Sequence, residues 1–107
     1  MASGRLGTAN ITTTDNTTIY TCPASNFAVV SVSLCNRGSG AITVRMAVAA
    51  SATPAADEYI EYDTSIGAKG VFERTGLVLD AGKKIVVTTG SAGTLSVVAY
   101  GIETSTT

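Results

Sequence analysis

The stretch LVLDAGKKIVVTTGSAGTLSVVAYGIE, from Leu77 to Glu103, decides the fold class of this chain. It divides into three segments rich in Val, Ile and Thr, separated by an Asp80-Ala-Gly turn and by a Gly90-Ser-Ala-Gly turn. β-branched residues fit a pleated surface, and short connections containing glycine between such segments are typical of antiparallel hairpins. The stretch therefore predicts the closing meander of a small β-sandwich.

The segment before this meander repeats the same signal. Between Phe27 and Asn36 the residues alternate, with Val30, Val32 and Leu34 on one face and more polar residues on the other. A period of two with one apolar side indicates a half-buried strand. Applied along the whole chain, this pattern predicts strands over residues 17–21, 27–36, 41–48, 58–64, 71–75, 77–79, 84–89 and 95–102. We therefore expect an all-β fold, a single antiparallel β-sandwich or jelly-roll-like domain of seven or eight strands.

Composition limits the classes of function. The chain has 107 residues, enough for one domain, and only 14% of them are charged, with a net charge of −1. A nucleic-acid partner would require clustered Lys and Arg, which the sequence lacks. No apolar run is long enough for a transmembrane helix, and the first residues lack the apolar region of a secretory signal. We expect no nucleic-acid or membrane partner, and folding in a cytoplasm.

The beginning of the chain differs in composition from the rest. Residues 1–16 are rich in Gly, Thr and Asn, with Leu6 and Ile11 as isolated apolar residues and Arg5 free to pair with a carboxylate. We expect an extended N-terminal arm over residues 1–16 that contacts another molecule, a sandwich domain over residues 17–103, and a polar tail over residues 104–107.

Groups suited to catalysis are scarce. The chain contains no His, the commonest general base, and Ser65 and Lys69 lie in a glycine-containing connection that would not align them. Glu58, Glu61 and Asp63 form one acidic cluster, in which the carboxylates could flank a sugar or bind Ca²⁺. We interpret it as a solvated or interface-facing strand, and we predict a protein without enzymatic activity, metal or cofactor.

The large rings leave two interpretations open. Tyr59, Tyr62, Tyr100 and Phe72 could stack on a glycan or anchor a protein interface, or they could pack in a core that has few aromatic residues. The candidate partner-binding residues are Arg5, Leu6, Ile11, Tyr59, Glu61 and Asp63.

Cys22 and Cys35 are the two cysteines. If they lie at distant ends of consecutive antiparallel strands, their separation exceeds the span of a disulfide. We predict that both remain reduced.

Three segments together resemble a known family: NITTTDNTTIYTCPA at residues 10–24, the strand, Asn-Arg loop and strand at residues 30–45, and YIEYD with ERTGLVLDAGK at residues 59–63 and 73–83. They are similar to small β-sandwich virion structural proteins of tailed phages, and the resemblance covers most of the chain. It implies no catalytic motif.

The resemblance implies a virion protein that is assembled in the host cytoplasm. It favours a capsid decoration (cement) protein, which would bind the major capsid protein or another virion protein and stabilise capsomer contacts. A symmetric homo-oligomer, such as a trimer, would suit a threefold capsid site. The alternative is a tail, baseplate or fibre module that binds a host glycan or a protein.

Overall fold

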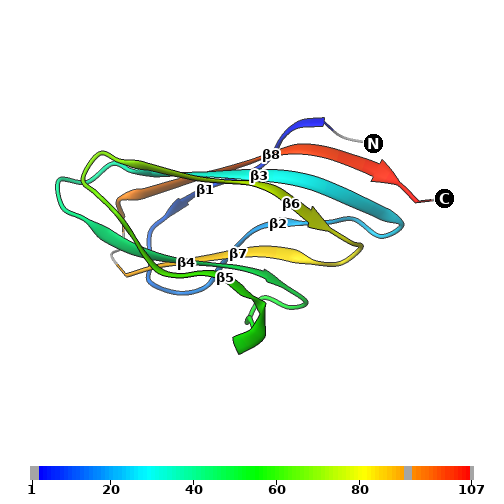
Figure 1. Cartoon of the computed structure of the whole chain (residues 1–107), viewed down its shortest axis with the longest axis horizontal. Coiled ribbons are helices and arrows are strands. Elements are labelled where there is room, and N and C mark those ends of the chain that lie inside the picture. The colour runs from blue at the N-terminus through cyan, green and yellow to red at the C-terminus, as the bar shows by residue number, and fades with distance from the viewer. Residues whose placement is uncertain (1–2, 91–92, 107) are drawn as a thin grey trace.

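A computed structural model describes residues 3–90 and 93–106 and shows two antiparallel sheets packed face to face (Figure 1). Sheet A has the strand order β1-β8-β3-β6, and sheet B has the order β2-β7-β4-β5. The elements are β1 (Ser3–Ile11), β2 (Thr17–Thr21), β3 (Asn26–Asn36), β4 (Ile42–Ala49), the short 3₁₀ turn η1 (Ala56–Glu58), β5 (Tyr59–Ile66), β6 (Val71–Leu79), β7 (Lys84–Thr89) and β8 (Leu95–Ser105). The predicted all-β sandwich is confirmed.

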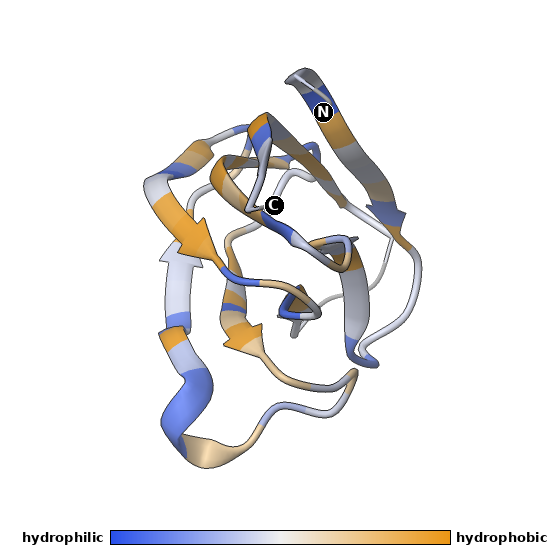
Figure 2. Cartoon of the chain, turned by 90° about the vertical axis from the view of Figure 1, so that its right-hand side faces the viewer, coloured by the Kyte–Doolittle hydropathy of each residue, from blue (hydrophilic) through white to orange (hydrophobic). Residues whose placement is uncertain are grey.

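Alternation along the strands builds the core between the sheets. Figure 2 shows bands of apolar and polar residues alternating along the strands. In β3, Val30, Val32 and Leu34 are fully buried, as the period of two predicts, and in β4 Met46 is fully buried. Removing an aliphatic side chain of this size from water contributes about 1.5–3 kcal/mol. Burial of small aliphatic residues therefore supplies the main stabilisation in a chain with few aromatic residues.

The prediction of an extended N-terminal arm is wrong for residues 3–11. Residues 3–11, which we expected in an extended arm, form β1 and pair antiparallel with β8 from Ser3 opposite Ile102 to Ile11 opposite Leu95. Gly7 makes this possible, because a Cβ atom there would lie 2.3 Å from the carbonyl oxygen of Ile19 in β2. The glycine content that indicated an irregular segment instead lets an edge strand approach the other sheet closely.

The polar tail is also shorter than predicted. Strand β8 continues to Ser105, so residues 104 and 105, expected in the tail, belong to sheet A. Pairing of Phe27 with Thr104 and of Asn26 with Ser105 provides the backbone partners that extend the strand. Residues 1, 2 and 107 of the predicted arm and tail, and residues 91 and 92 of the glycine turn, lie outside the described residues.

The strands at the sheet edges share one property. The pairing of each edge strand, β1, β2, β5 and β6, with its neighbour is interrupted by a register shift. The central pairs β3–β8 and β4–β7 keep a continuous register. Bulges twist an edge away from a regular ladder and oppose the addition of a further strand. The sheet faces are therefore better suited to contacts with other molecules than the edges are.

Polar contacts link the two sheets along their sides. The Tyr20 hydroxyl of β2 donates to the Glu103 carboxylate of β8 at 2.5 Å. Arg74 of β6 forms an ion pair with Glu61 of β5. Burial, together with the neighbouring Glu103 carboxylate, raises the pKa of Tyr20 well above its ordinary range. Tyr20 therefore stays neutral and keeps its hydrogen bond at physiological pH.

Both cysteines are free. Cys22 is buried and exchanges backbone hydrogen bonds with Gly82 and Lys83 after the end of β6, whereas Cys35 pairs with Val71 at the start of β6. The length of β6 therefore separates the two thiols, in agreement with the prediction.

Candidate functional site

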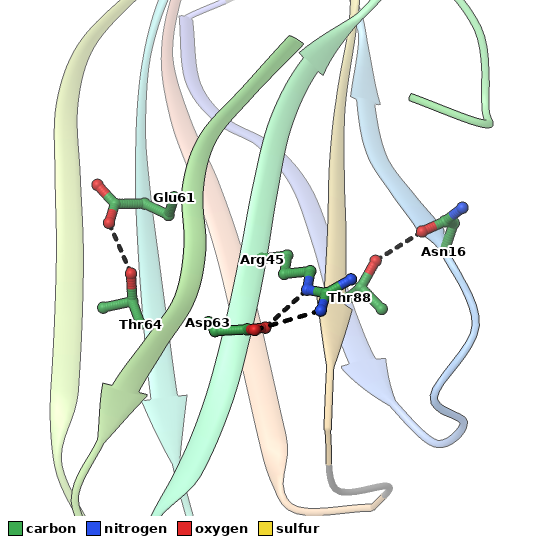
Figure 3. A network of polar contacts seen from close by, with 6 residues as sticks. All are labelled: Asn16, Arg45, Glu61, Asp63, Thr64 and Thr88. Carbon is green, nitrogen blue, oxygen red and sulfur yellow. Dashed lines mark hydrogen bonds and ion pairs between the residues drawn. The ribbon is translucent and has the colours of Figure 1, made fainter. Parts of the chain in front are cut away.

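The acidic cluster expected from sequence is dispersed by the fold. Glu58 accepts hydrogen bonds from the backbone N–H groups of Ala50 and Ala55, which ties down the β4–β5 loop and lowers the pKa of this carboxyl. Glu61 and Asp63 project to opposite sides of β5, as Figure 3 shows. Each carboxylate therefore has a separate partner, and neither a paired-carboxylate site nor a calcium site forms here.

The Asp63 side chain points to the side of β5 opposite Glu61 (Figure 3) because the backbone at Asp63 departs from regular strand geometry. Its φ of 55° lies in the left-handed region, which Asp tolerates better than most residues, and the β4–β5 register shifts at this point. The bulge places the Asp63 carboxylate beside Arg45 of β4. Arg45 Nε donates to Asp63 Oδ1 at 2.7 Å, and a second guanidinium nitrogen donates to Oδ2 at 3.2 Å.

Two tyrosine rings pack beside the Arg45–Asp63 ion pair, and both of its groups are charged at neutral pH. The guanidinium carbon of Arg45 lies 3.9 Å from the centroid of the Tyr62 ring, and Tyr62 in turn packs edge-on against Tyr59 at 5.2 Å. The hydrogen bonds lower the pKa of Asp63 and raise the pKa of Arg45. Both groups are therefore ionised at neutral pH, and their charges cancel.

A groove lies beside the pair on the outer face of sheet B. It encloses about 570 Å³ and combines strand residues with the loop that precedes β2. In Figure 3 the Thr88 hydroxyl donates to Asn16 of that loop, at 2.6 Å, next to Arg45. The lining residues are Thr14, Thr43, Arg45, Asp63, Thr88, Thr89 and Gly90. We call this feature the sheet B groove.

The opposite side of the molecule carries a contiguous apolar surface. On the outer face of sheet A, Val29 is paired with Ile102 on one side and with Val78 on the other. Val78 is 66% exposed and Ile102 is 48% exposed. The surface consists of Phe27, Val29, Val78, Tyr100 and Ile102, and we call it the sheet A patch. Single exposed apolar residues are ordinary, whereas a contiguous group of them marks an interaction site.

Two charged residues, Glu73 and Arg5, border the sheet A patch beside Tyr100. Tyr100 donates its hydroxyl to Glu73, and this contact raises the pKa of the phenol. Arg5 of β1 is exposed and lies opposite Tyr100 in the register. Within residues 3–90 and 93–106, Arg5 makes no ion pair or side-chain hydrogen bond, so its charge is free to meet a carboxylate.

The fold separates the candidate partner-binding residues. Ile11, which we had expected to contact another molecule, is 1% exposed and is instead part of the core of its own domain. Leu6 is partly buried and packs against the same core. Tyr59 is half-buried over Ala47, Ala49 and Val86.

The three charged candidates have different surroundings. Glu61 links the two sheets, whereas Arg5 borders the sheet A patch and Asp63 lines the sheet B groove.

Sequence reasoning missed most of both surfaces. The threonines of the groove come from β4, β7 and the loop before β2, and only the register of sheet B brings them together. The exposed residues of the sheet A patch were partly visible in the alternation, because Phe27 and Val29 are apolar residues on the polar side of their strand. Apolar residues at these exposed positions were the signal in the sequence that pointed to the sheet A patch.

The described part of the chain contains no group of three or more Cys, Asp or Glu side chains placed to hold a metal ion. Among the same residues, no helix has the length and apolarity required to cross a bilayer.

In comparisons with known proteins, no family model matches the chain, and no curated protein matches it either. The resemblance to phage virion proteins therefore stays a prediction.

Proposed function

We propose that this chain is a non-catalytic structural protein of a tailed-phage virion that binds another virion protein through the sheet A patch. The observation that carries the proposal is the row formed by Ile102, Val29 and Val78 across three neighbouring strands. Exposed apolar side chains in direct cross-strand contact form a flat surface, and burying them against a partner is favourable.

The contact is made through a sheet face. All four edge strands carry register shifts, which oppose the addition of a partner strand. The partner is a flat protein surface that is apolar at its centre and carries a carboxylate facing Arg5. Arg and Tyr are enriched in protein interfaces, and the patch has Tyr100 inside it and Arg5 beside it.

The energetics favour a repeated contact. A patch on the order of 400 Å² gains about 10 kcal/mol from apolar burial at about 25 cal/mol per Å². Association itself costs about 4–15 kcal/mol, so a single contact is weak. An array of identical sites, with a homo-oligomer such as a trimer engaging several of them, converts weak contacts into stable attachment. A capsid decoration protein that binds the major capsid protein where capsomers meet uses this arrangement.

A second candidate is a tail, baseplate or fibre module that binds a host glycan. The sheet B groove favours this alternative, because it offers polar groups on the face opposite the patch. The two candidates use different surfaces, so they can be tested separately.

The test uses particles of the phage that encodes the chain, stripped of the protein and then incubated with purified variants. Val78→Lys and Ile102→Lys place charges at exposed positions and should leave folding intact within about 0.5 kcal/mol. We expect each to abolish rebinding, whereas Ser65→Lys, at an exposed position of β5, should rebind as the wild type does. Rebinding of both patch variants at wild-type occupancy would contradict the proposal.

A further inference from the structure

The sheet B groove has a charge balance that selects its ligand. The Arg45 and Asp63 side chains are 38% and 51% exposed and neutralise each other at a bidentate contact. An anion attracted to Arg45 meets the carboxylate of Asp63, and a cation attracted to Asp63 meets the guanidinium. The groove therefore disfavours ions of either sign and favours a neutral ligand.

The groove is also rich in hydrogen-bonding capacity. A guanidinium has five N–H donors and a carboxylate has about four acceptor positions, so the bidentate contact leaves groups of both kinds unused. Thr43 and Thr88 point outward from β4 and β7 and add hydroxyl groups. Thr88 donates its proton to Asn16, which leaves its oxygen able to accept. Donors and acceptors thus alternate over a short distance.

The shape and surroundings narrow the ligand further. The volume of about 570 Å³ is in the range of small-molecule sites, but none of the described residues that line the groove has a large apolar side chain. An apolar ligand would gain little there. Tyr62 lies under Arg45, whose guanidinium covers one face of its ring, so this ring supports the ion pair. A compact, neutral ligand with many hydroxyl groups fits this charge balance, hydrogen-bonding capacity and lining.

We infer that the sheet B groove, built on the Arg45–Asp63 pair with Thr43 and Thr88, is a binding site for a neutral pyranose sugar. The sugar hydroxyls exchange hydrogen bonds with the free edges of the ion pair and with the threonine hydroxyls. This inference concerns a different face from the sheet A patch, so it stands or fails independently of the proposed attachment to the virion.

The experiment is a two-dimensional ¹H–¹⁵N NMR titration of the ¹⁵N-labelled full chain. The probes are the methyl glycosides of glucose, galactose, mannose and N-acetylglucosamine, with glucuronate as the anionic and glucosamine as the cationic probe. We expect at least one neutral glycoside to shift the signals of Thr43, Thr88, Gly90 and Arg45 Nε, with a Kd of about 1–10 mM. The charged probes should bind at least about tenfold more weakly.

Variants distinguish a specific site from general surface contact. Thr43→Val and Thr88→Val each remove one hydroxyl and should weaken binding about 3- to 10-fold, whereas Thr75→Val, at an exposed position of β6 in the other sheet, should not change it. Asp63→Asn leaves Arg45 unbalanced, so glucuronate should then bind more tightly than the neutral glycosides.

Three outcomes overturn the inference. The first is that no neutral glycoside shifts the groove signals at about 50 mM, well above the Kd expected of a weak site. The second is that shifts appear but are scattered over the surface or insensitive to both threonine variants. The third is that glucuronate or glucosamine binds the wild-type chain more tightly than every neutral probe.

Discussion

Asn36 joins the two sheets at one end of the sandwich, and its removal should be costly. It lies at the end of β3 and is fully buried. Its side-chain amide donates to the carbonyl oxygens of Gly40, Ile66 and Gly67 at 2.9, 3.2 and 3.1 Å, and its oxygen accepts from the Gly38 N–H at 2.9 Å. One amide thus organises the β3–β4 and β5–β6 connections, where the chain passes between sheets.

The magnitude follows from these contacts. Asn36→Ala leaves four backbone groups without their partner, and each unsatisfied buried group costs about 1–3 kcal/mol. The contact with Ile66 is fully buried, whereas those with Gly40 and Gly67 are partly buried, so water can replace part of what is lost. We expect a loss of about 3–5 kcal/mol, a large share of the typical stability of about 5–15 kcal/mol.

Urea unfolding followed by circular dichroism measures this loss, because the chain has no Trp to report on unfolding. The matched control is Asn26→Ala, which removes one exposed hydrogen bond to Ala24 and should cost at most about 1 kcal/mol. If Asn36→Ala unfolds within about 1 kcal/mol of the wild type, the reasoning is refuted.

Asn36→Asp tests the same contacts through the pH dependence of stability. At neutral pH its carboxylate faces three carbonyl oxygens and cannot donate. The pKa of this aspartate is then raised above its unfolded value, so stability present in acid is lost as pH rises through the folded pKa. The variant should therefore recover stability as pH is lowered, and a variant that does not recover would contradict this geometry.

Three other substitutions test separate features of the fold by urea unfolding. Gly7→Ala should lower the free energy of unfolding by more than about 2 kcal/mol, since the added Cβ would meet the Ile19 carbonyl. The control Gly40→Ala places its Cβ in open space and should be nearly neutral. Equal effects of the two substitutions would show that β1 is not held against β2. Because the pKa of Tyr20 is raised in the folded state, the stability that its neutral hydroxyl contributes is complete below about pH 10 and is lost progressively above that pH. Tyr20→Phe should therefore be less stable than the wild type at pH 7, and its free energy of unfolding should fall less steeply in alkali. Parallel pH profiles of the two proteins would contradict this. Thr94→Val removes a buried hydroxyl that has no partner among the described residues and should leave stability unchanged or raise it by about 1 kcal/mol, whereas a loss would show that the hydroxyl is bonded.

Local pattern predicted much of the fold. The bounds of β2 and β7 coincide with the segments expected from composition and turns, and the buried face of β3 follows its alternation. These features depend on neighbouring residues, so a single sequence contains them. The pairing of β1 with β8 depends on contacts between opposite ends of the chain, and no local pattern encodes it.

The functional surfaces were harder to predict for the same reason. Asp63 was expected in one acidic cluster with Glu61, but its left-handed backbone and the register shift turn it toward Arg45. The sheet A patch requires that β3 lie between β6 and β8. Register and strand order are set by the whole core, so the sequence marked candidate residues without showing which of them meet.

The central proposal is that the sheet A patch attaches this chain to a tailed-phage virion, and cryo-electron microscopy of virions purified from the proposed phage source tests this most directly. The account predicts density for the sandwich on the outer surface of the capsid, with Val78 and Ile102 against the major capsid protein and a carboxylate of that protein beside Arg5. Particles that lack the chain, or particles that carry it with the sheet A patch facing solvent, would contradict the account.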